Sequence, residues 1–360
     1  MCRRFLAVVA ALLWATAAFS APATIVSRGP AIQFGAEQLI VRSPSLDREF
    51  LVEVMPPHSP RLYPTQTFPV VYALDNGYRI AGLVLRNMGA SGVMANAYVV
   101  SVGYKPADYG RRMHDLMHRP VRFNNRDAGG GAEAFERFLI DELRPLIEAG
   151  HPVDHKRAIF IGQSASGLFG ANLIERRPGA FSAFVLGSPS FWLEPEALPR
   201  VARAKGAGER VFIAVGGKEE AEMTRPAAAL AKALRGRFRT ELKVYPGATH
   251  NAHYLRTLVD ALPAFLPTQQ DLRAPPYRVL REDELKPFLG LFRLEDGRTL
   301  RFRAMDGFLW ADLPGGGSTA FITERPGRFY SVGLDTTVTF EGERLTLRPP
   351  GAEFRAVRSE

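Results

Sequence analysis

The sequence predicts a mostly parallel α/β domain followed by a small antiparallel β domain. From about residue 38 to residue 266, short apolar runs rich in Val, Ile and Phe alternate with helical patterns, which is typical of a parallel sheet covered by helices. A stretch bounded by Pro267 and Pro276 breaks this pattern. Beyond it, apolar and polar side chains alternate with a period of two, as in half-buried antiparallel strands. We therefore expect an α/β domain over residues 28–268, a linker over 269–280 and a β domain over 281–360.

Seven apolar runs are candidate strands of the first domain, and several are nearly continuous, as expected of strands buried on both faces. They cover residues 50–55, 70–74, 98–103, 158–161, 183–186, 211–215 and 242–245. Apolar residues at helical spacing predict a helix over residues 135–147, which Pro145 should bend or break. Further helices are expected just after Ser164 and near residues 226–234 and 254–262.

Turn signals divide the second domain into strands. The pairs Asp296-Gly297, Asp306-Gly307 and Glu341-Gly342 stand where tight turns should join neighbouring strands. A domain of about 80 residues is large enough to have a hydrophobic core of its own.

The first 20 residues predict a cleavable secretory signal. Arg3 and Arg4 lead into an apolar run over residues 5–19, which closes on small residues before Ala21. A retained membrane anchor is the alternative. The only cysteine, Cys2, lies in this segment, so the mature chain should have neither disulfides nor cysteine chemistry. We expect a protein of the bacterial periplasm or exterior, with no membrane span after the leader is removed.

The composition is that of a globular protein, with 46% hydrophobic and 23% charged residues. The formal net charge of +9 comes from basic residues spread along the chain without a dense run. Since no recognisable nucleic-acid-binding module accompanies this charge, nucleic acid is not an expected partner. The sequence gives no indication of the oligomeric state.

The sharpest chemical signal is a strand-to-helix turn around Ser164. An apolar strand runs into Gly162-Gln163-Ser164-Ala165-Ser166 and then into a helical pattern. This context is typical of the nucleophile elbow of the α/β-hydrolase fold, where small residues flank a serine presented at the edge of the sheet. Ser166 stands where a second glycine is usual, but serine is also small. Ser166 itself is the weaker candidate nucleophile, because no glycine lies two residues before it.

A base and an acid follow Ser164 in the chain order of that fold, which is Ser, acid, His. Glu219 and Glu220 come directly after the strand over 211–215, and His250 lies in the loop after the strand over 242–245. Both loops should reach the same sheet edge as Ser164. We expect a triad of Ser164, Glu219 and His250, in which the base activates the serine and the acid orients the base. Glu220 and His253 are the competing acid and base.

The oxyanion hole of this fold uses two backbone N–H groups. One should come from Ala165, the residue after the nucleophile. The other should come from the loop after the strand over 70–74, where Asn76 and Gly77 are the candidates. Such a site needs no metal and no cofactor.

The sequence resembles the esterase D / enterochelin esterase-like family. The resemblance starts in the strand end Val71 to Gly77 and continues, in order, through residues 112–116, 130–135, 162–168, 188–190, 215–219 and 247–250. It implies that the family's nucleophile, acid and histidine fall on Ser164, Glu219 and His250. The chain departs from the family pattern at Gln163 and Ser166, where His and Gly are frequent, and at Asn76. The β tail resembles the small lipocalin-like domain appended to some serine hydrolases, which implies no chemistry.

Residues 104–131 show no clean periodicity and should form a loop or cap over the site. The segment is rich in basic side chains, which could recognise an anionic acyl group or a catecholate, although a solvated basic loop is the simpler interpretation. Arg111 and Arg112, with Tyr78 from the earlier loop, are the candidate substrate contacts. His114 and His118 have the spacing of a metal pair, but no third ligand accompanies them, so we expect no metal site.

Three functions fit these patterns. Hydrolysis of a small-molecule ester, either neutral or anionic, through an acyl-enzyme comes first. Acyl transfer comes second, because the resemblance extends to mycolyltransferases, and a transesterified product with an added alcohol would distinguish it. A non-catalytic ligand-binding protein comes third, and it would not react with a fluorophosphonate.

Overall fold

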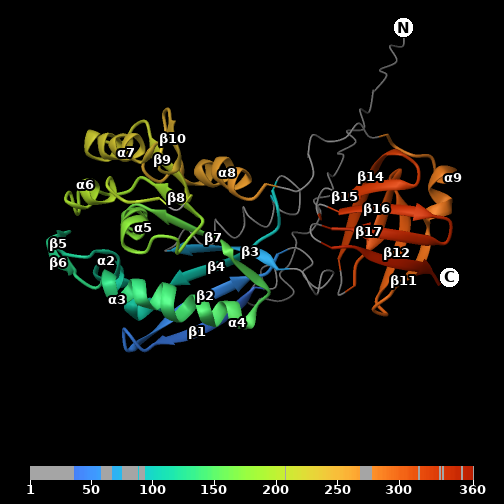
Figure 1. Cartoon of the computed structure of the whole chain (residues 1–360), viewed down its shortest axis with the longest axis horizontal. Coiled ribbons are helices and arrows are strands. Elements are labelled where there is room, and N and C mark those ends of the chain that lie inside the picture. Colours follow the sequence, from blue (N-terminus) through green and yellow to red (C-terminus); the bar gives the residue numbers. More distant parts are fainter. Residues whose placement is uncertain are drawn as a thin grey trace, which may run out of the picture. The chain divides into compact units, whose positions relative to one another are not determined.

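The computed structural model describes residues 36–57, 67–74, 88, 94–206, 208–267, 278–314, 317–331, 334, 336–349 and 352–359 (Figure 1). The predicted signal segment, most of the predicted linker, and the loop with Asn76, Gly77 and Tyr78 lie outside these residues. Among the described residues, no helix is both long and apolar enough to cross a membrane.

The first domain contains an eight-stranded, mostly parallel sheet, as the sequence predicted. Its strand order is β1-β2-β4-β3-β7-β8-β9-β10, with β1, β2 and β4 paired antiparallel and the remaining pairs parallel. The strands are β1 (Glu37–Ser43), β2 (Arg48–Met55), β3 (Phe68–Leu74), β4 (Tyr98–Gly103), β7 (Val153–Gln163), β8 (Ala183–Gly187), β9 (Arg210–Gly216) and β10 (Arg239–Tyr245). This mixed sheet, with its flanking helices, is that of an α/β-hydrolase-like fold.

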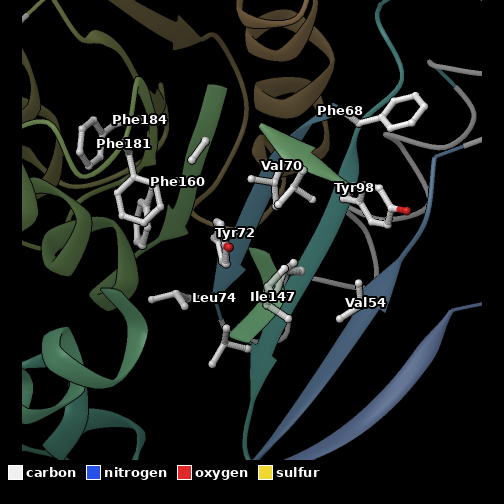
Figure 2. Packing of buried hydrophobic residues seen from close by; sticks show 14 of the residues in the cluster. Val54, Phe68, Val70, Tyr72, Leu74, Tyr98, Ile147, Phe160, Phe181 and Phe184 are labelled. Carbon is white, nitrogen blue, oxygen red and sulfur yellow. The ribbon is translucent and has the colours of Figure 1, made fainter. Parts of the chain in front are cut away.

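Buried side chains cover both faces of the sheet. Along β3, Tyr72 belongs to the hydrophobic cluster of one face and Val71 to that of the other, because successive side chains of a strand point to opposite sides. Figure 2 shows the first cluster, in which Tyr72, Phe160 and Phe181 lie together. On the other face, helix α8 (Tyr254–Phe265) places its buried Leu258 in the second cluster. The central strands are therefore fixed from both sides.

Helices lie at the predicted positions, with one additional short helix over residues 197–201 that the sequence did not indicate. They are α3 (Ala132–Arg137), η4 (Phe138–Leu143), α4 (Arg144–Gly150), α5 (Ala165–Arg176), α6 (Ala197–Val201), α7 (Ala221–Leu234) and α8. Pro145 does not break the helix that it was expected to interrupt. The turn before it, η4, is a π-helix in which the N–H of Arg144 bonds to the carbonyl of Leu139. This wider turn accommodates a residue that lacks an N–H and would crowd an α-helix.

The segment over residues 104–131 is more ordered than the sequence indicated. It contains η3 (Pro106–Arg111), α2 (Arg112–Leu116) and a hairpin of β5 (Pro120–Phe123) and β6 (Arg126–Gly129). Asn124 and Asn125 form the hairpin turn with positive φ angles of 49° and 59°, a conformation that Asn tolerates better than most residues. We call residues 104–131 the cap segment.

A buried polar network ties the cap segment to the helices beneath it. His118 Nε2 lies 2.6 Å from Glu136 Oε1, and Arg176 donates to the same oxygen from 2.8 Å. Glu194 accepts hydrogen bonds from the backbone N–H groups of His118 and Arg119 at 2.5 and 3.0 Å. Burial opposes the charged form of His118, but its hydrogen bond to Glu136 and the Glu194 carboxylate 3.8 Å from its Nδ1 prevail and raise its pKa.

This raised pKa predicts a loss of stability at alkaline pH. The contribution of protonated His118 should be fully present below its unfolded-state pKa of about 6.5 and should be lost as the pH rises through the higher folded-state pKa. We expect the loss to be about 1–3 kcal/mol, the range of charge-assisted hydrogen bonds. Chemical denaturation of the wild type and of His118→Gln across pH 6 to 9 measures it. Parallel stability curves for the two proteins would exclude a charged His118.

The second domain is a closed antiparallel barrel, which confirms the predicted β domain. Its strands pair in sequence order and β18 closes onto β11. They are β11 (Gly290–Leu294), β12 (Thr299–Met305), β13 (Phe308–Asp312), β14 (Ser318–Arg325), β15 (Arg328–Ser331), β16 (Thr336–Glu341), β17 (Arg344–Arg348) and β18 (Phe354–Arg358), preceded by α9 (Glu282–Leu285) and η5 (Lys286–Phe288). Asp306 and Gly307, with φ angles of 55° and 77°, form one of the predicted turns.

Aromatic rings fill the barrel. Phe340 has its ring centroid 5.5 Å from that of Phe292 and 5.3 Å from that of Phe302, and Phe329 lies 5.8 Å away. All four side chains are buried. The barrel therefore contains a packed hydrophobic core of its own, as small barrels do.

Candidate active site

Ser164 occupies a strained turn between β7 and α5. Its backbone has φ 63° and ψ −119°, a conformation that residues with a Cβ rarely adopt. Its N–H bonds to the carbonyl of Gly187 on β8 at 2.8 Å, and the carbonyl of Ser164 accepts the N–H of Leu168 in the new helix at 3.0 Å. Strain of this kind persists only where surrounding contacts enforce it, and it raises the serine hydroxyl above the sheet edge.

The small residues around Ser164 are required by backbone contacts. A Cβ atom on Gly162 would lie 2.2 Å from the carbonyl oxygen of Ser166, and one on Gly167 would lie 2.7 Å from that of Gly187. Ser166 itself is buried, and its hydroxyl closes the turn by accepting the N–H of Gln163 and donating to the carbonyl of Gln163, both at 2.9 Å. Its hydroxyl therefore serves the turn and does not face a substrate.

Glu219 and His250 meet at the same edge of the sheet. Glu219 follows β9 and His250 follows β10, and these strands are parallel neighbours. Glu219 Oε2 lies 2.6 Å from His250 Nδ1. The Glu219 side chain is only 3% exposed, whereas that of His250 is 36% exposed. Glu220, the competing acid, is exposed at the N-terminus of α7.

The surroundings of Glu219 keep it ionised. Its Oε1 accepts the Gly216 N–H and the Ser188 hydroxyl, both at 2.6 Å. Burial alone would raise the pKa of Glu219, but hydrogen bonds from His250, His253, Ser188 and Gly216 outweigh it and hold the pKa far below the usual range. A carboxylate facing Nδ1 fixes the tautomer in which His250 presents Nε2 on the opposite side of the ring.

Ser164 and His250 are not hydrogen-bonded to each other in the described structure. The Ser164 hydroxyl lies 3.2 Å from that of Ser190 instead. Nucleophile–base hydrogen bonds are often long or absent without substrate and form in the substrate complex. The loop of His250 is nevertheless anchored to the nucleophile turn, because the Gln163 side-chain amide donates to the His250 carbonyl at 2.7 Å.

Sequence reasoning missed three residues of this site. Ser188 and Ser190 come from the loop after β8 and contact Glu219 and Ser164, respectively. His253, considered only as a competing base, lies 3.4 Å from Glu219 Oε1 through its Nε2 and is fully buried. A signal for the two serines was present, because Ser188-Pro189-Ser190 directly follows an apolar strand that ends at the same sheet edge.

The other predicted site residues are placed as follows. Ala165 is the first residue of α5, where N–H groups have no acceptor within the helix. Arg111 is exposed and lies 3.8 Å from Asp108. Arg112 lines a cleft in the cap segment. Asn76, Gly77 and Tyr78 lie outside the described residues, so their predicted roles stay predictions.

The cleft in the cap segment has a volume of about 550 Å³ and contains two guanidinium groups. It is lined by Tyr109, Gly110, Arg112, Met113, Phe123, Asn124, Arg126, Asp127 and Ala128. The ring of Phe123 also packs against Trp192, with centroids 6.3 Å apart. Trp192 is 45% exposed and follows Ser190 by two residues. The half-buried Phe123 and the exposed Trp192 thus connect the cleft with the loop that contacts Ser164.

Comparison with known protein families identifies the family to which the chain belongs. The model of the family described as "Putative esterase" matches residues 43–265, which include the whole Ser164 site. The chain belongs to this family of serine hydrolases. Membership confirms the resemblance drawn from the sequence motifs and identifies the first domain as an esterase domain.

Curated relatives match a part of this domain. The chain is 30% identical over 181 residues to the ferri-bacillibactin esterase BesA of Bacillus subtilis, which covers 45% of this chain and 61% of that protein. It is 29% identical over 136 residues to the siderophore triacetylfusarinine C esterase of Aspergillus fumigatus, covering 34% and 44% of the two chains. The matched segment thus spans less than two thirds of either relative.

A solved structure shares the fold. The crystal structure of the BES protein from Bacillus cereus has a TM-score of 0.61 and 22% sequence identity, and the match covers 68% of this chain and 99% of that one. At this identity the likeness concerns the fold alone. It supports the α/β-hydrolase-like architecture of the first domain.

Proposed function

We propose that the protein hydrolyses carboxylic esters with Ser164 as nucleophile, His250 as base and Glu219 as the orienting acid. The observation that carries the proposal is the combination of a strained serine elbow with a 2.6 Å Glu219–His250 hydrogen bond at the same sheet edge. Membership of an esterase family supports it. The chain order of Ser164, Glu219 and His250, which is that of α/β-hydrolases, also supports the proposal.

The proposed reaction has two steps, acylation of Ser164 and hydrolysis of the acyl-enzyme. Ser164 Oγ attacks the ester carbonyl carbon while His250 Nε2 takes its proton, and the tetrahedral oxyanion is stabilised by the Ala165 N–H and by one from the loop at Asn76 and Gly77. Collapse breaks the bond to the alcohol, which leaves with the proton from His250. Water, activated by the same base, then releases the acid and restores Ser164.

The substrate class we propose is an anionic or catecholate ester of the siderophore type. Two curated relatives are named as esterases of siderophores. The cleft is lined by two arginines, Arg112 and Arg126, against one carboxylate, Asp127, and its Phe123 packs against Trp192, so an excess of positive charge lies beside aromatic surface. Guanidinium groups bind oxyanions well, and aromatic rings bind planar aryl groups. We also propose export of the chain to the periplasm or exterior, on the strength of its N-terminal segment.

A panel of esters tests this substrate class. We expect hydrolysis of short p-nitrophenyl esters and a higher kcat/KM for ferric or iron-free catecholate siderophore esters, measured by chromatography of the products. Arg126→Gln should raise KM for the anionic substrates about two- to fivefold, the effect of one exposed ion pair, and leave KM for p-nitrophenyl acetate unchanged. Arg122→Gln, an exposed change on the same hairpin outside the cleft, is the matched control. Equal preference for neutral and anionic esters would refute the assigned substrate class.

A further inference from the structure

Glu219 lies close to a second histidine, His253, as well as to its hydrogen-bonded partner His250. We propose that His253 and Ser188 are positioning residues, which act through Glu219 to orient His250 for catalysis. This inference rests on the proposed function, since it assigns roles around the proposed acid. We call Ser188, His253 and Thr257 the rear chain of Glu219.

The distances form a continuous hydrogen-bonded chain. Ser188 Oγ lies 2.6 Å from Glu219 Oε1 and 2.7 Å from His253 Nε2. His253 Nδ1 lies 3.0 Å from Thr257 Oγ1, which in turn lies 3.1 Å from the backbone carbonyl of His253. The chain runs from the rear oxygen of the carboxylate to the first turn of α8.

The direction of the two hydrogen bonds at Ser188 follows from the number of protons. An ionised Glu219 can only accept, so Ser188 uses its single proton on Oε1. The Ser188 oxygen must then accept from His253, which therefore carries its proton on Nε2. This nitrogen points at the acid, and the ring is fully buried, so His253 has no free nitrogen for a substrate. The geometry makes His253 a support for Glu219 and leaves His250 as the base.

Packing holds the rear chain rigid. The His253 ring stacks on Tyr245 with centroids 5.8 Å apart and planes within 10°. Ser188 has a positive φ of 39°, and its N–H bonds to the carbonyl of Ala214 at 2.7 Å. Such a strained backbone persists only where its surroundings require it. Here the conformation directs the Ser188 hydroxyl between the carboxylate and the second imidazole.

The rear chain fixes the plane of the Glu219 carboxylate. Oε1 is fixed by the Ser188 hydroxyl and the Gly216 N–H, with His253 Nε2 3.4 Å away, which leaves Oε2 for His250. Loss of the rear chain would allow the carboxylate to turn, and a misplacement of about 1 Å in a catalytic group can cost about 100-fold in rate. Substrate binding would be unaffected, because no member of the rear chain faces the solvent-accessible side of the site.

Kinetics of Ser188→Ala and His253→Leu test the proposal. We expect kcat for p-nitrophenyl ester hydrolysis to fall about 10- to 100-fold in each, with KM within about twofold of the wild type. The double variant should lose no more than the worse single variant, because the two residues act as one chain. His253→Gln and Ser188→Thr keep a donor and a hydroxyl, and they should recover most of the activity. Full activity in both Ser188→Ala and His253→Leu, or a rise in KM without a fall in kcat, would overturn the proposal.

The Glu219→Gln background separates a positioning role from a general structural one. If Ser188 and His253 act through the carboxylate, adding either substitution to Glu219→Gln should change kcat by less than about twofold. A further 10-fold loss in that background would overturn the proposal. Circular dichroism shows whether each variant folds. If His253→Leu does not fold, Ser188→Ala, which is the smaller change, is sufficient to test the proposal.

A measurement without substrate distinguishes failure of this inference from failure of the proposed function. The Nδ1 proton of His250, held at 2.6 Å from Glu219, should give a low-field proton NMR resonance that disappears in His250→Gln. We expect Ser188→Ala and His253→Leu to shift or broaden it. An unchanged resonance in both would overturn the positioning role even in a protein without esterase activity.

Discussion

Replacement of Ser164 by alanine is expected to lower kcat for ester hydrolysis by about 10⁴- to 10⁶-fold, the range for loss of a catalytic serine. The substitution removes the attacking oxygen but leaves the turn, because the backbone bonds of Ser164 to Gly187 and Leu168 do not involve its side chain. Steady-state kinetics on p-nitrophenyl acetate measure the loss. Circular dichroism and a thermal melt establish that the variant folds.

Ser166→Ala is the matched control for the nucleophile. It removes a hydroxyl that lies two residues after Ser164 and is hydrogen-bonded to the backbone of Gln163. We therefore expect the free energy of unfolding to fall by about 1–3 kcal/mol. Its reaction with a fluorophosphonate should still occur at Ser164. Turnover by Ser164→Ala at the wild-type rate would exclude Ser164 as the nucleophile.

Replacement of Glu219 by glutamine is expected to lower kcat by about 10⁴-fold, as when a triad acid loses its charge. The amide preserves the shape of the side chain but can no longer fix the His250 tautomer or stabilise the imidazolium. KM should change little, since Glu219 lies behind the histidine and is only 3% exposed. The kcat and KM values of the purified variant, measured between pH 6 and 9, test this expectation.

Glu220→Gln provides a control one residue away. Glu220 is exposed at the start of α7, and a solvated carboxylate there should contribute little to the rate. We expect less than a twofold change in kcat. A large loss in Glu220→Gln together with normal turnover in Glu219→Gln would assign the acid to Glu220 instead.

The central features of the fold could be predicted because they depend on local sequence. Strands buried on both faces are mostly apolar, so β3, β4, β8, β9 and the second half of β7 stand out as runs rich in Val, Ile and Phe. The elbow at Ser164 is equally local, since Gly162 and the small residues after Ser164 satisfy contacts within a few positions. Parallel strands bring their carboxyl ends to one edge, so the loops with Glu219 and His250 could be placed there from chain order alone.

Elements that depend on distant contacts could not be predicted. Strand β1 is an edge strand with polar residues at both ends and an exposed Ile40, so its apolar run is only three residues long. The short β5–β6 hairpin was not predicted, because strands of four residues give little periodicity. The part played by Ser188 and His253 depends on side chains from three loops meeting around Glu219. Ser188 could be placed at this sheet edge because it follows an apolar strand, but the sequence neighbours of Ser188 and His253 do not indicate their contacts around Glu219.

Covalent labelling with a fluorophosphonate probe, followed by peptide mass spectrometry, tests the central claim most directly. The strained elbow and the Glu219–His250 pair predict a single adduct of one probe per chain, located on Ser164, that forms slowly in Glu219→Gln and is absent in Ser164→Ala. An unlabelled wild-type protein, or an adduct on another residue, would contradict a serine nucleophile at position 164.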